Sequence, residues 1–184
     1  MKKILAIALA MLMLLAMTAC SGGEEVQKFD TSVKALEAVW NAMPEDYKFF
    51  AMGGDLEHPV DNAPGAYNYT EASALKNYFG FPEDKVAQIT EVAGLFHAMN
   101  LNTFTCGAFK LSNASEMQSI AAAVKDSVLS TQWMCGFPEK LIVMSVGGEY
   151  LVSFYGNGEL VEVFKNTALE NCLGSKVLFE EVIE

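Results

Sequence analysis

Arginine is absent from this chain of 184 residues, and histidine occurs only twice. The 12 basic residues are therefore all lysines, and they stand against 23 acidic residues, which gives a net charge of −11 at pH 7. Recognition of nucleic-acid phosphates depends on arginine forks and on a positive electrostatic field. The composition therefore excludes nucleic acid as a partner, and the few scattered lysines disfavour electrostatic docking onto anionic lipid.

The chain also lacks the short motifs that mark many catalytic and metal sites. It contains no Cys-x-x-Cys pair, no Gly-x-Ser-x-Gly nucleophile elbow, no His-Glu-x-x-His helix and no glycine-rich phosphate loop. These absences favour a domain that binds without catalysing a reaction, and we expect it to use no cofactor.

The most informative segment that is present lies at the N-terminus. Two lysines precede an apolar run at 4–17, which is shorter than the roughly 20 residues that a membrane-spanning helix needs. The run leads into Met17-Thr18-Ala19-Cys20, which is typical of a bacterial lipoprotein signal, although Leu, Val or Ile is commoner where Met17 stands. We predict cleavage before Cys20 and lipidation of its thiol; the alternative is an ordinary cleaved signal with a chance cysteine.

This signal predicts the domain organisation and the location. Residues 1–19 would be the signal peptide, 20–29 a lipidated flexible tether and 30–184 a single domain. Removing 1–19 leaves 165 residues and takes away two lysines, so the net charge becomes −13. The diacylglycerol on Cys20 would carry two acyl chains, such as palmitate, and two chains anchor a protein stably. We therefore expect a protein of the cell envelope that is held at the cell membrane by the lipid on Cys20 and faces outside the cytoplasm.

Hydrophobic periodicity predicts an α+β fold. A small, mainly antiparallel sheet of about four strands, including a hairpin at 141–155, would pack with three to four helices. Residues 45–66 show no sustained period and are interpreted as a long ordered loop. Helices are expected at 31–43, 70–79, 113–128 and 158–173, and strands at 89–95, 101–111, 141–146, 149–155 and, as a short strand or tail, 177–183.

The hairpin at 141–155 is apolar on both faces. Gly147-Gly148 fits a two-residue turn that requires positive φ. That turn would place Val143 opposite Val152 and Leu141 opposite Phe154. Because both faces carry apolar side chains, we expect helices or loops to cover part of each.

The layout resembles a family of small Gram-positive lipoproteins known as domain of unknown function 4358. The resemblance covers 33–169 and rests on the stretches 77–84 (NYFGFPED), 113–116 (NASE) and 148–152 (GEYLV). The chain departs from the family where Thr103-Phe104 replaces an acidic strand position, and in its arginine-free middle helix. The resemblance implies only an envelope lipoprotein, since the family carries no established activity.

The loop at 55–61 holds the best candidate metal ligands. Asp55, Glu57, His58 and Asp61 offer oxygen donors and one imidazole within seven residues, which suits a divalent cation. A metal-binding module or a metal-dependent hydrolase is therefore the alternative function. The spacing matches no known metal loop, and a solvated acidic loop explains the same residues.

Three cysteines remain besides Cys20, so an exported domain would keep at least one thiol free. Cys106 and Cys135 could form a disulfide, or these two and Cys172 could be buried core residues. His97 and Cys106 would form a nucleophile and base only if they touch, and otherwise His97 is a partly buried histidine bonded to the backbone.

Aromatic residues are concentrated at 47–50, 67–69 and 133–137. They would either line a groove for a sugar, a peptide or a partner protein, or pack as core beneath long loops. The favoured function is thus a non-catalytic envelope lipoprotein that binds a protein or sugar partner. A solute receptor of a transporter would need two lobes and a longer chain, and a thiol-redox role would need an exposed, acidic thiol.

Overall fold

The computed structural model describes residues 25–134 and 136–183; the predicted signal peptide, Cys20 and Cys135 lie outside them. Eight antiparallel strands form one sheet in the order β2-β1-β4-β5-β7-β6-β8, and β3 also pairs with β4. The strands are β1 Ala51–Gly54, β2 Pro59–Asp61, β3 Gly65–Ala66, β4 Ile89–His97, β5 Phe104–Leu111, β6 Lys140–Val146, β7 Tyr150–Gly156 and β8 Lys176–Val182.

The fold is mixed α and β, but the predicted sheet of about four strands is wrong. Three of the additional strands, β1, β2 and β3, lie within 45–66, which was interpreted as a loop. They are four, three and two residues long. Strands this short show too few alternations for a period of two to be visible in the sequence.

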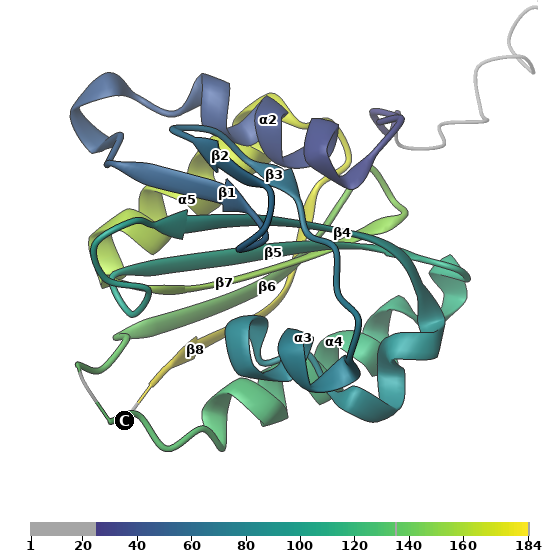
Figure 1. The fold of residues 1–184 in the computed structure, drawn as a ribbon. Coiled ribbons are helices and arrows are strands. Elements are labelled where there is room, and N and C mark those ends of the chain that lie inside the picture. Colours follow the sequence, from purple (N-terminus) through teal and green to yellow (C-terminus); the bar gives the residue numbers. More distant parts are fainter. Residues whose placement is uncertain (1–24, 135, 184) are drawn as a thin grey trace, which may run out of the picture.

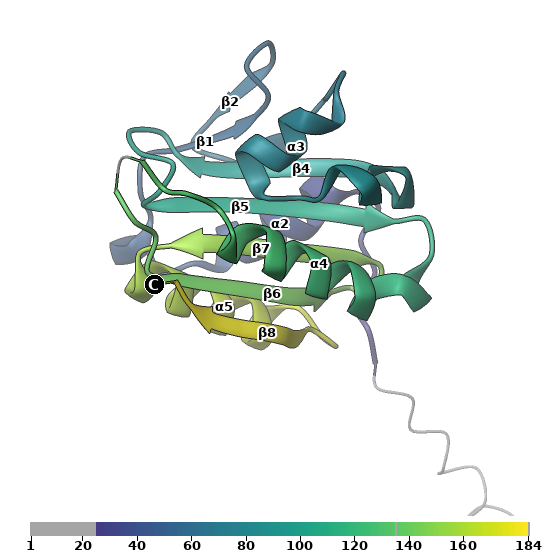
Figure 2. The ribbon, with the colours of Figure 1, turned by 90° about the horizontal axis from the view of Figure 1, so that it is seen from below.

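Helices cover both faces of the sheet (Figures 1 and 2). The helices α2 (Ser32–Ala42) and α5 (Gly158–Asn171) lie on one face, and α3 (Ala72–Phe79) and α4 (Met117–Leu129) lie on the other. Short 3₁₀ segments at Glu45–Tyr47, Glu83–Gln88 and Ala114–Glu116 connect them to the strands. Within the described residues, no helix is both long and apolar enough to cross a membrane.

Side chains at the helix ends explain where the helices begin. The hydroxyl of Thr31 accepts a hydrogen bond from the Lys34 amide at 3.2 Å, and this caps α2. The side chain of Asn157 caps α5 in the same way. At its C-terminal end, α3 stops at Gly80, which adopts the left-handed conformation that favours glycine.

Two hydrophobic cores result, one on each face of the sheet. The core under α2 and α5 contains Phe104, Phe154 and Phe164, and the core under α3 and α4 contains Phe79 and Phe109. The central strands therefore have no solvent-facing side, because each of their faces packs against helices. This confirms the expectation that both faces of the hairpin are covered.

The predicted register of that hairpin is wrong by one residue. Val146 pairs with Tyr150, so the turn has three residues, and Val143 lies opposite Ser153. The shift places Leu151 in the core under α3 and α4, on the opposite face from Met144. With apolar residues on both faces, burial does not distinguish between the two registers.

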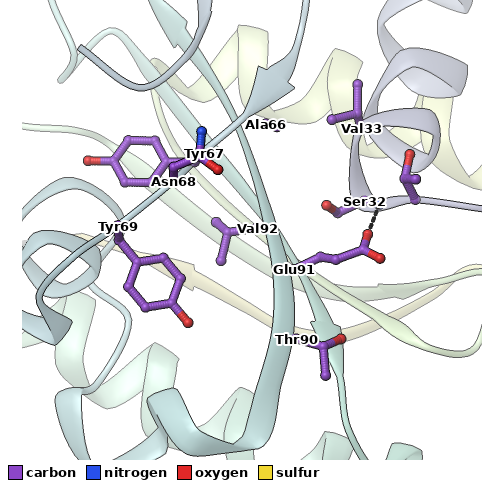
Figure 3. Close-up of a pocket in the computed structure, with 10 residues that line it drawn as sticks. Ser32, Val33, Ala66, Tyr67, Asn68, Tyr69, Thr90, Glu91 and Val92 are labelled. Atoms are coloured by element: carbon purple, nitrogen blue, oxygen red, sulfur yellow. Dashed lines mark hydrogen bonds between the residues drawn. The ribbon is translucent and has the colours of Figure 1, made fainter. Parts of the chain in front are cut away.

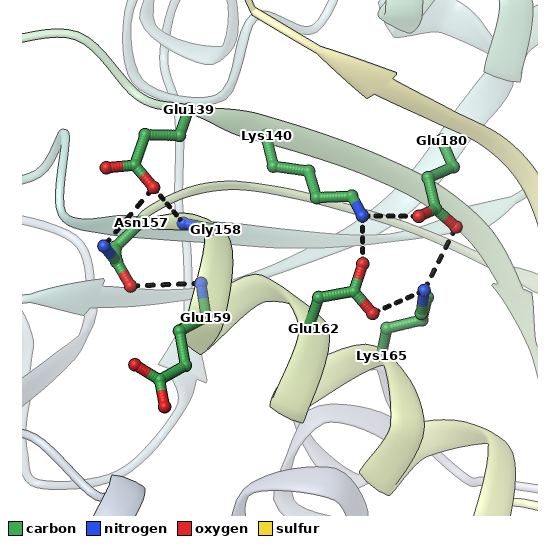
Figure 4. Close-up of polar contacts among 8 residues, drawn as sticks. All are labelled: Glu139, Lys140, Asn157, Gly158, Glu159, Glu162, Lys165 and Glu180. Atoms are coloured by element: carbon green, nitrogen blue, oxygen red, sulfur yellow. Dashed lines mark hydrogen bonds and ion pairs between the residues drawn. The ribbon is translucent and has the colours of Figure 1, made fainter.

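Four alternating charges tie the C-terminal strand to α5 (Figure 4). Lys140 on β6 pairs with Glu162 on α5 and, at 2.5 Å, with Glu180 on β8. Lys165 completes the group, at 2.7 Å from Glu162 and 3.1 Å from Glu180. Hydrogen bonds from the two lysines lower the pKa of Glu162 to about 2 and also lower that of Glu180.

Candidate binding site

Asp55 organises the loop that follows β1. One carboxylate oxygen accepts hydrogen bonds from the backbone amides of Glu57 at 2.9 Å and His58 at 2.8 Å. The other oxygen accepts from the backbone amide of Asn68 at 3.0 Å and from its side-chain amide at 2.8 Å. Burial raises the pKa of Asp55, but these hydrogen bonds outweigh it and hold the pKa well below its usual range.

The four predicted metal ligands do not form a common centre. Nδ1 of His58 lies 3.1 Å from the Asp55 carboxylate, whereas Glu57 and Asp61 are exposed on the β1–β2 hairpin. Among residues 25–134 and 136–183, no group of three or more His, Cys, Asp or Glu side chains is placed to hold a metal ion. Asp55 instead serves as an acceptor that fixes local backbone.

Close backbone contacts bring the next segment alongside β4. A Cβ atom on Gly53 would lie 2.2 Å from the carbonyl oxygen of Ala63, so only glycine permits this approach. The indole N–H of Trp40 donates to the carbonyl of Asn62 at 2.9 Å. The amide of Tyr67 then donates to the carbonyl of Val92 at 2.9 Å. Residues 67–69 are thereby held against the outer edge of β4.

A cavity of about 410 Å³ lies between this segment and the start of α2 (Figure 3). Its walls are formed by 31–33, 66–69 and 90–92. Figure 3 shows Tyr69 and Glu91 on either side of Val92. The Glu91 carboxylate accepts a hydrogen bond from the Ser32 amide at 3.0 Å and lies 3.5 Å from the Lys110 ammonium.

Two further cavities adjoin the same segment. One, of about 280 Å³, is lined by Leu56, Tyr78 and Leu101 among others, and one of about 260 Å³ is lined by Leu56, Asn68 and Tyr78 among others. Tyr67 lines all three cavities and packs edge-to-face on Phe79 with ring centroids 4.8 Å apart. Burial raises its pKa to about 12, so its hydroxyl stays protonated at neutral pH. The aromatic stretch 67–69 thus forms the wall of a hollowed surface.

The other aromatic stretches are divided between core and surface. Phe49 packs in the core against Trp40 and Phe104, whereas its neighbour Phe50 is exposed. Trp133 packs against Tyr155, with ring centroids 5.2 Å apart. Met134 and Phe137, which follow it in the sequence, are exposed. The stretches 47–50 and 133–137 therefore each contain aromatic residues that pack against other rings and apolar residues that are exposed to solvent.

The thiols and His97 have separate environments. Cys106 and Cys172 are free and buried, and burial raises the pKa of both, that of Cys172 to about 11. The ring of His97 stacks on Phe49, and its Nδ1 lies 3.3 Å from the amides of Met99 and Asn100. This fits a partly buried histidine bonded to the backbone, and burial keeps the Cys106 thiol protonated and away from solvent.

Sequence reasoning missed Glu91 and Ser32 as lining residues of the largest of these cavities. Glu91 was detectable in principle, because it is the one acidic residue within the predicted apolar strand 89–95. Ser32 carries no comparable signal, since a serine at the start of a predicted helix is typical of a cap.

Comparison of the chain with protein-family models, with curated proteins and with solved structures finds no match. The interpretation of the site therefore rests on the geometry of the chain itself.

Proposed function

We propose that this protein is a lipid-anchored, extracytoplasmic binding domain that takes a small polar ligand, a saccharide, in the cavities around 67–69. The anchor is the lipid on Cys20, as the N-terminal signal predicts. The resemblance to the family of domain of unknown function 4358 points to the same location.

The observation that carries this proposal is the Asp55–Asn68 contact beside an aromatic hollow. The four hydrogen bonds to Asp55 fix the segment 67–69 before any ligand arrives, which lowers the ordering cost of binding. The largest cavity combines the apolar Val92 and the ring of Tyr69 with the polar groups of Asn68 and Glu91. Aromatic faces beside a few fixed polar groups suit a sugar, which has an apolar C–H face and polar edges.

A binding role fits these side chains better than catalysis. The carboxylate of Glu91 is engaged by the Ser32 amide and by Lys110. Among the described residues, the free thiols of Cys106 and Cys172 are buried and have raised pKa values, so neither is suited to act as a nucleophile at neutral pH. A metal-dependent hydrolase at 55–61 gains no support, because the described residues gather no set of ligands there.

Thermal unfolding in the presence of saccharides tests the ligand. A soluble form beginning at Ser21 would be heated with N-acetylhexosamine oligomers and with neutral hexose oligomers. A sugar present at about 100 times its dissociation constant should stabilise the domain by about 2.7 kcal/mol. Tyr69→Ala and Glu91→Gln should abolish this shift, and Tyr47→Ala, on the 3₁₀ segment after α2, should retain it. If neither class of sugar raises the unfolding temperature, the proposed ligand is contradicted.

Membrane fractionation tests the anchor independently. Cys20→Ser should release the full-length protein from the membrane fraction of the bacterium and abolish the mass added by the lipid. Cys172→Ala is the matched control and should remain bound. Equal retention of both variants would contradict lipid anchoring, without affecting the saccharide result.

A further inference from the structure

The exposed apolar side chains of the described residues are concentrated at one end of the sheet. Six large apolar side chains define this surface, here called the distal surface, and the most exposed are Met134 at 91% and Met99 at 78%. They come from four segments that are far apart in the sequence: Phe50, Leu56, Met99, Leu101, Met134 and Phe137.

Contacts between these segments join them into one surface. Leu56 and Leu101 line the same cavity. The amide of Ala98 donates to the carbonyl of Phe50 at 2.9 Å. The side-chain amide of Asn102 donates to the carbonyl of Gly136 at 3.0 Å, which holds the segment carrying Met134 and Phe137 beside the β4–β5 turn.

This surface lies at the opposite end of the sheet from the N-terminal residues. The amide of Gln27 donates to the carbonyl of Leu173, and a Cβ on Gly147 in the β6–β7 turn would touch Phe29. The β4–β5 turn lies at the other end, where Phe104, Gly156 and Lys140 pair. Seven-residue strands separate the two ends by roughly 20 Å. Figure 1 shows the first described residues on the right and the β4–β5 loop on the left.

Three of the four segments that carry the distal surface contain no lysine, and the nearby Lys140 is paired with Glu162 and Glu180. The loops 55–62, 98–103 and 133–139 contain no lysine, and their acidic residues are Asp55, Glu57, Asp61 and Glu139. Lys48, near Phe50, is paired with Glu45 at 2.9 Å. Two copies of this surface would bring like charges together, so a second copy of the chain is disfavoured. A partner with apolar anchors flanked by basic residues would complement both features.

We propose that the distal surface docks a protein segment in which apolar side chains alternate with lysine or arginine. Met99, Met134 and Phe137 supply apolar contacts, and Glu57 and Asp61 supply the charge. These three apolar residues line none of the cavities around 67–69, so binding through them does not depend on the proposed sugar site or on the lipid. The proposed anchor adds only a direction: it would point this surface away from the membrane, toward partners in the envelope.

Titration with three synthetic peptides tests the proposal on the soluble form beginning at Ser21. One peptide alternates Leu with Lys, the second Leu with Glu and the third Ser with Lys, and binding is followed by fluorescence anisotropy. We expect binding of the Leu/Lys peptide alone. The triple variant Met99→Ser/Met134→Ser/Phe137→Ser should weaken it at least tenfold. Glu57→Gln/Asp61→Asn should weaken it and reduce its dependence on salt.

The control variant is Leu169→Ser/Leu173→Ser, which removes exposed leucines at the C-terminal end of α5. It should leave peptide binding unchanged. Equal loss in the control, equal binding of the Leu/Glu peptide, or no binding of any peptide would overturn the proposal. Dimerisation through the same side chains, detected by sedimentation velocity and lost in the triple variant, would overturn it in favour of a second copy. A preserved saccharide shift and circular dichroism spectrum in the triple variant would show that the fold and the proposed sugar site are intact.

Discussion

The carboxylate of Asp55 accepts two hydrogen bonds, of 2.8 and 3.0 Å, from Asn68, which lies thirteen residues later in the chain. One comes from the backbone and one from the side chain, so the pair fixes both the position and the orientation of Asn68. The contact connects the β1–β2 loop to the segment 67–69. The shape of the proposed sugar site therefore depends on a residue that was expected to be a metal ligand.

Asp55→Ala should loosen the segment 67–69 while leaving the sheet intact. Removal of the acceptor leaves the amides of Glu57, His58 and Asn68 without their partner, so local opening becomes easier. Hydrogen exchange of these amides should accelerate by roughly tenfold or more. Amides in β5 and β7 serve as the internal control and should exchange at their original rates. Unchanged exchange at Asn68 would contradict the role given to Asp55.

Gly53→Ala should destabilise the protein by about 3 kcal/mol, because the new Cβ meets backbone atoms that cannot rotate away. Urea unfolding of the soluble form measures the loss. Gly148→Ala is a milder comparison, since its Cβ would approach Val26 only to 3.4 Å and the cost comes from a positive φ of 73°. We expect about 1 kcal/mol there. Similar losses in both variants would contradict the close packing of β1 on the chain at 63–65.

The stability of the protein should depend on pH through Glu162. Its pKa is lowered to about 2 from a usual 4.5, so its stabilising contribution is complete above about pH 4.5 and is lost as the pH falls towards 2. Lys140→Met should flatten this part of the profile and cost about 1 kcal/mol at pH 7, a modest value because the glutamates are partly exposed. Thermal unfolding without denaturant, at pH values between 2 and 7, measures both effects.

The control for that experiment is Lys34→Met, which breaks an exposed pair with Glu37 on α2. Pairs of this kind contribute roughly 0.2–1 kcal/mol. If Lys34→Met flattens the acid profile as much as Lys140→Met does, the group around Glu162 has no special role.

Cys106 and Cys172 should resist thiol reagents in the folded protein. Both are buried, and burial raises the pKa of each thiol, so little reactive thiolate exists at pH 7. Mass spectrometry after maleimide treatment should find them unlabelled in buffer and fully labelled in urea. Rapid labelling of Cys106 in buffer would contradict this prediction and would support a thiol-based function.

Cys106→Ser tests the same environment by stability. The substitution places a hydroxyl inside the hydrophobic core cluster that contains Cys106, which should cost about 1–3 kcal/mol. Cys106→Ala keeps the site apolar and should cost less than the serine variant. If urea unfolding shows a larger loss of stability for Cys106→Ala than for Cys106→Ser, the surroundings of this residue are not apolar.

Long amphipathic elements were predictable from the sequence. The buried stripe of α4, which includes Ile120, Val124 and Val128, was read directly from its spacing. The start of α2 at Thr31 and the end of α3 at Gly80 follow from cap residues. The helix predicted at 70–79 begins two residues later, at Ala72.

Short elements and register were not predictable. The lack of a period predicts a loop at 45–66, yet Gly53 lies in β1, where only glycine tolerates the neighbouring chain. The candidate site could not be predicted from the sequence for a related reason. Tyr69 comes to line the same cavity as Glu91 and Val92 only after β3 pairs with β4, a long-range contact that no local pattern records.

The antiparallel pairing of β5 with β7 divides the sheet into two halves that differ in how they can form. On one side, β4 and β5 are joined by a short turn, and on the other, β6 and β7 are joined by three residues. The β5–β7 ladder, in contrast, closes a loop of some forty residues that contains both α4 and β6. Hairpins form on a microsecond scale, whereas distant pairings bear the entropy of closing the intervening chain. We therefore expect the pairing of β5 with β7 to be the slow step in folding, and the two hairpins that meet there to form first.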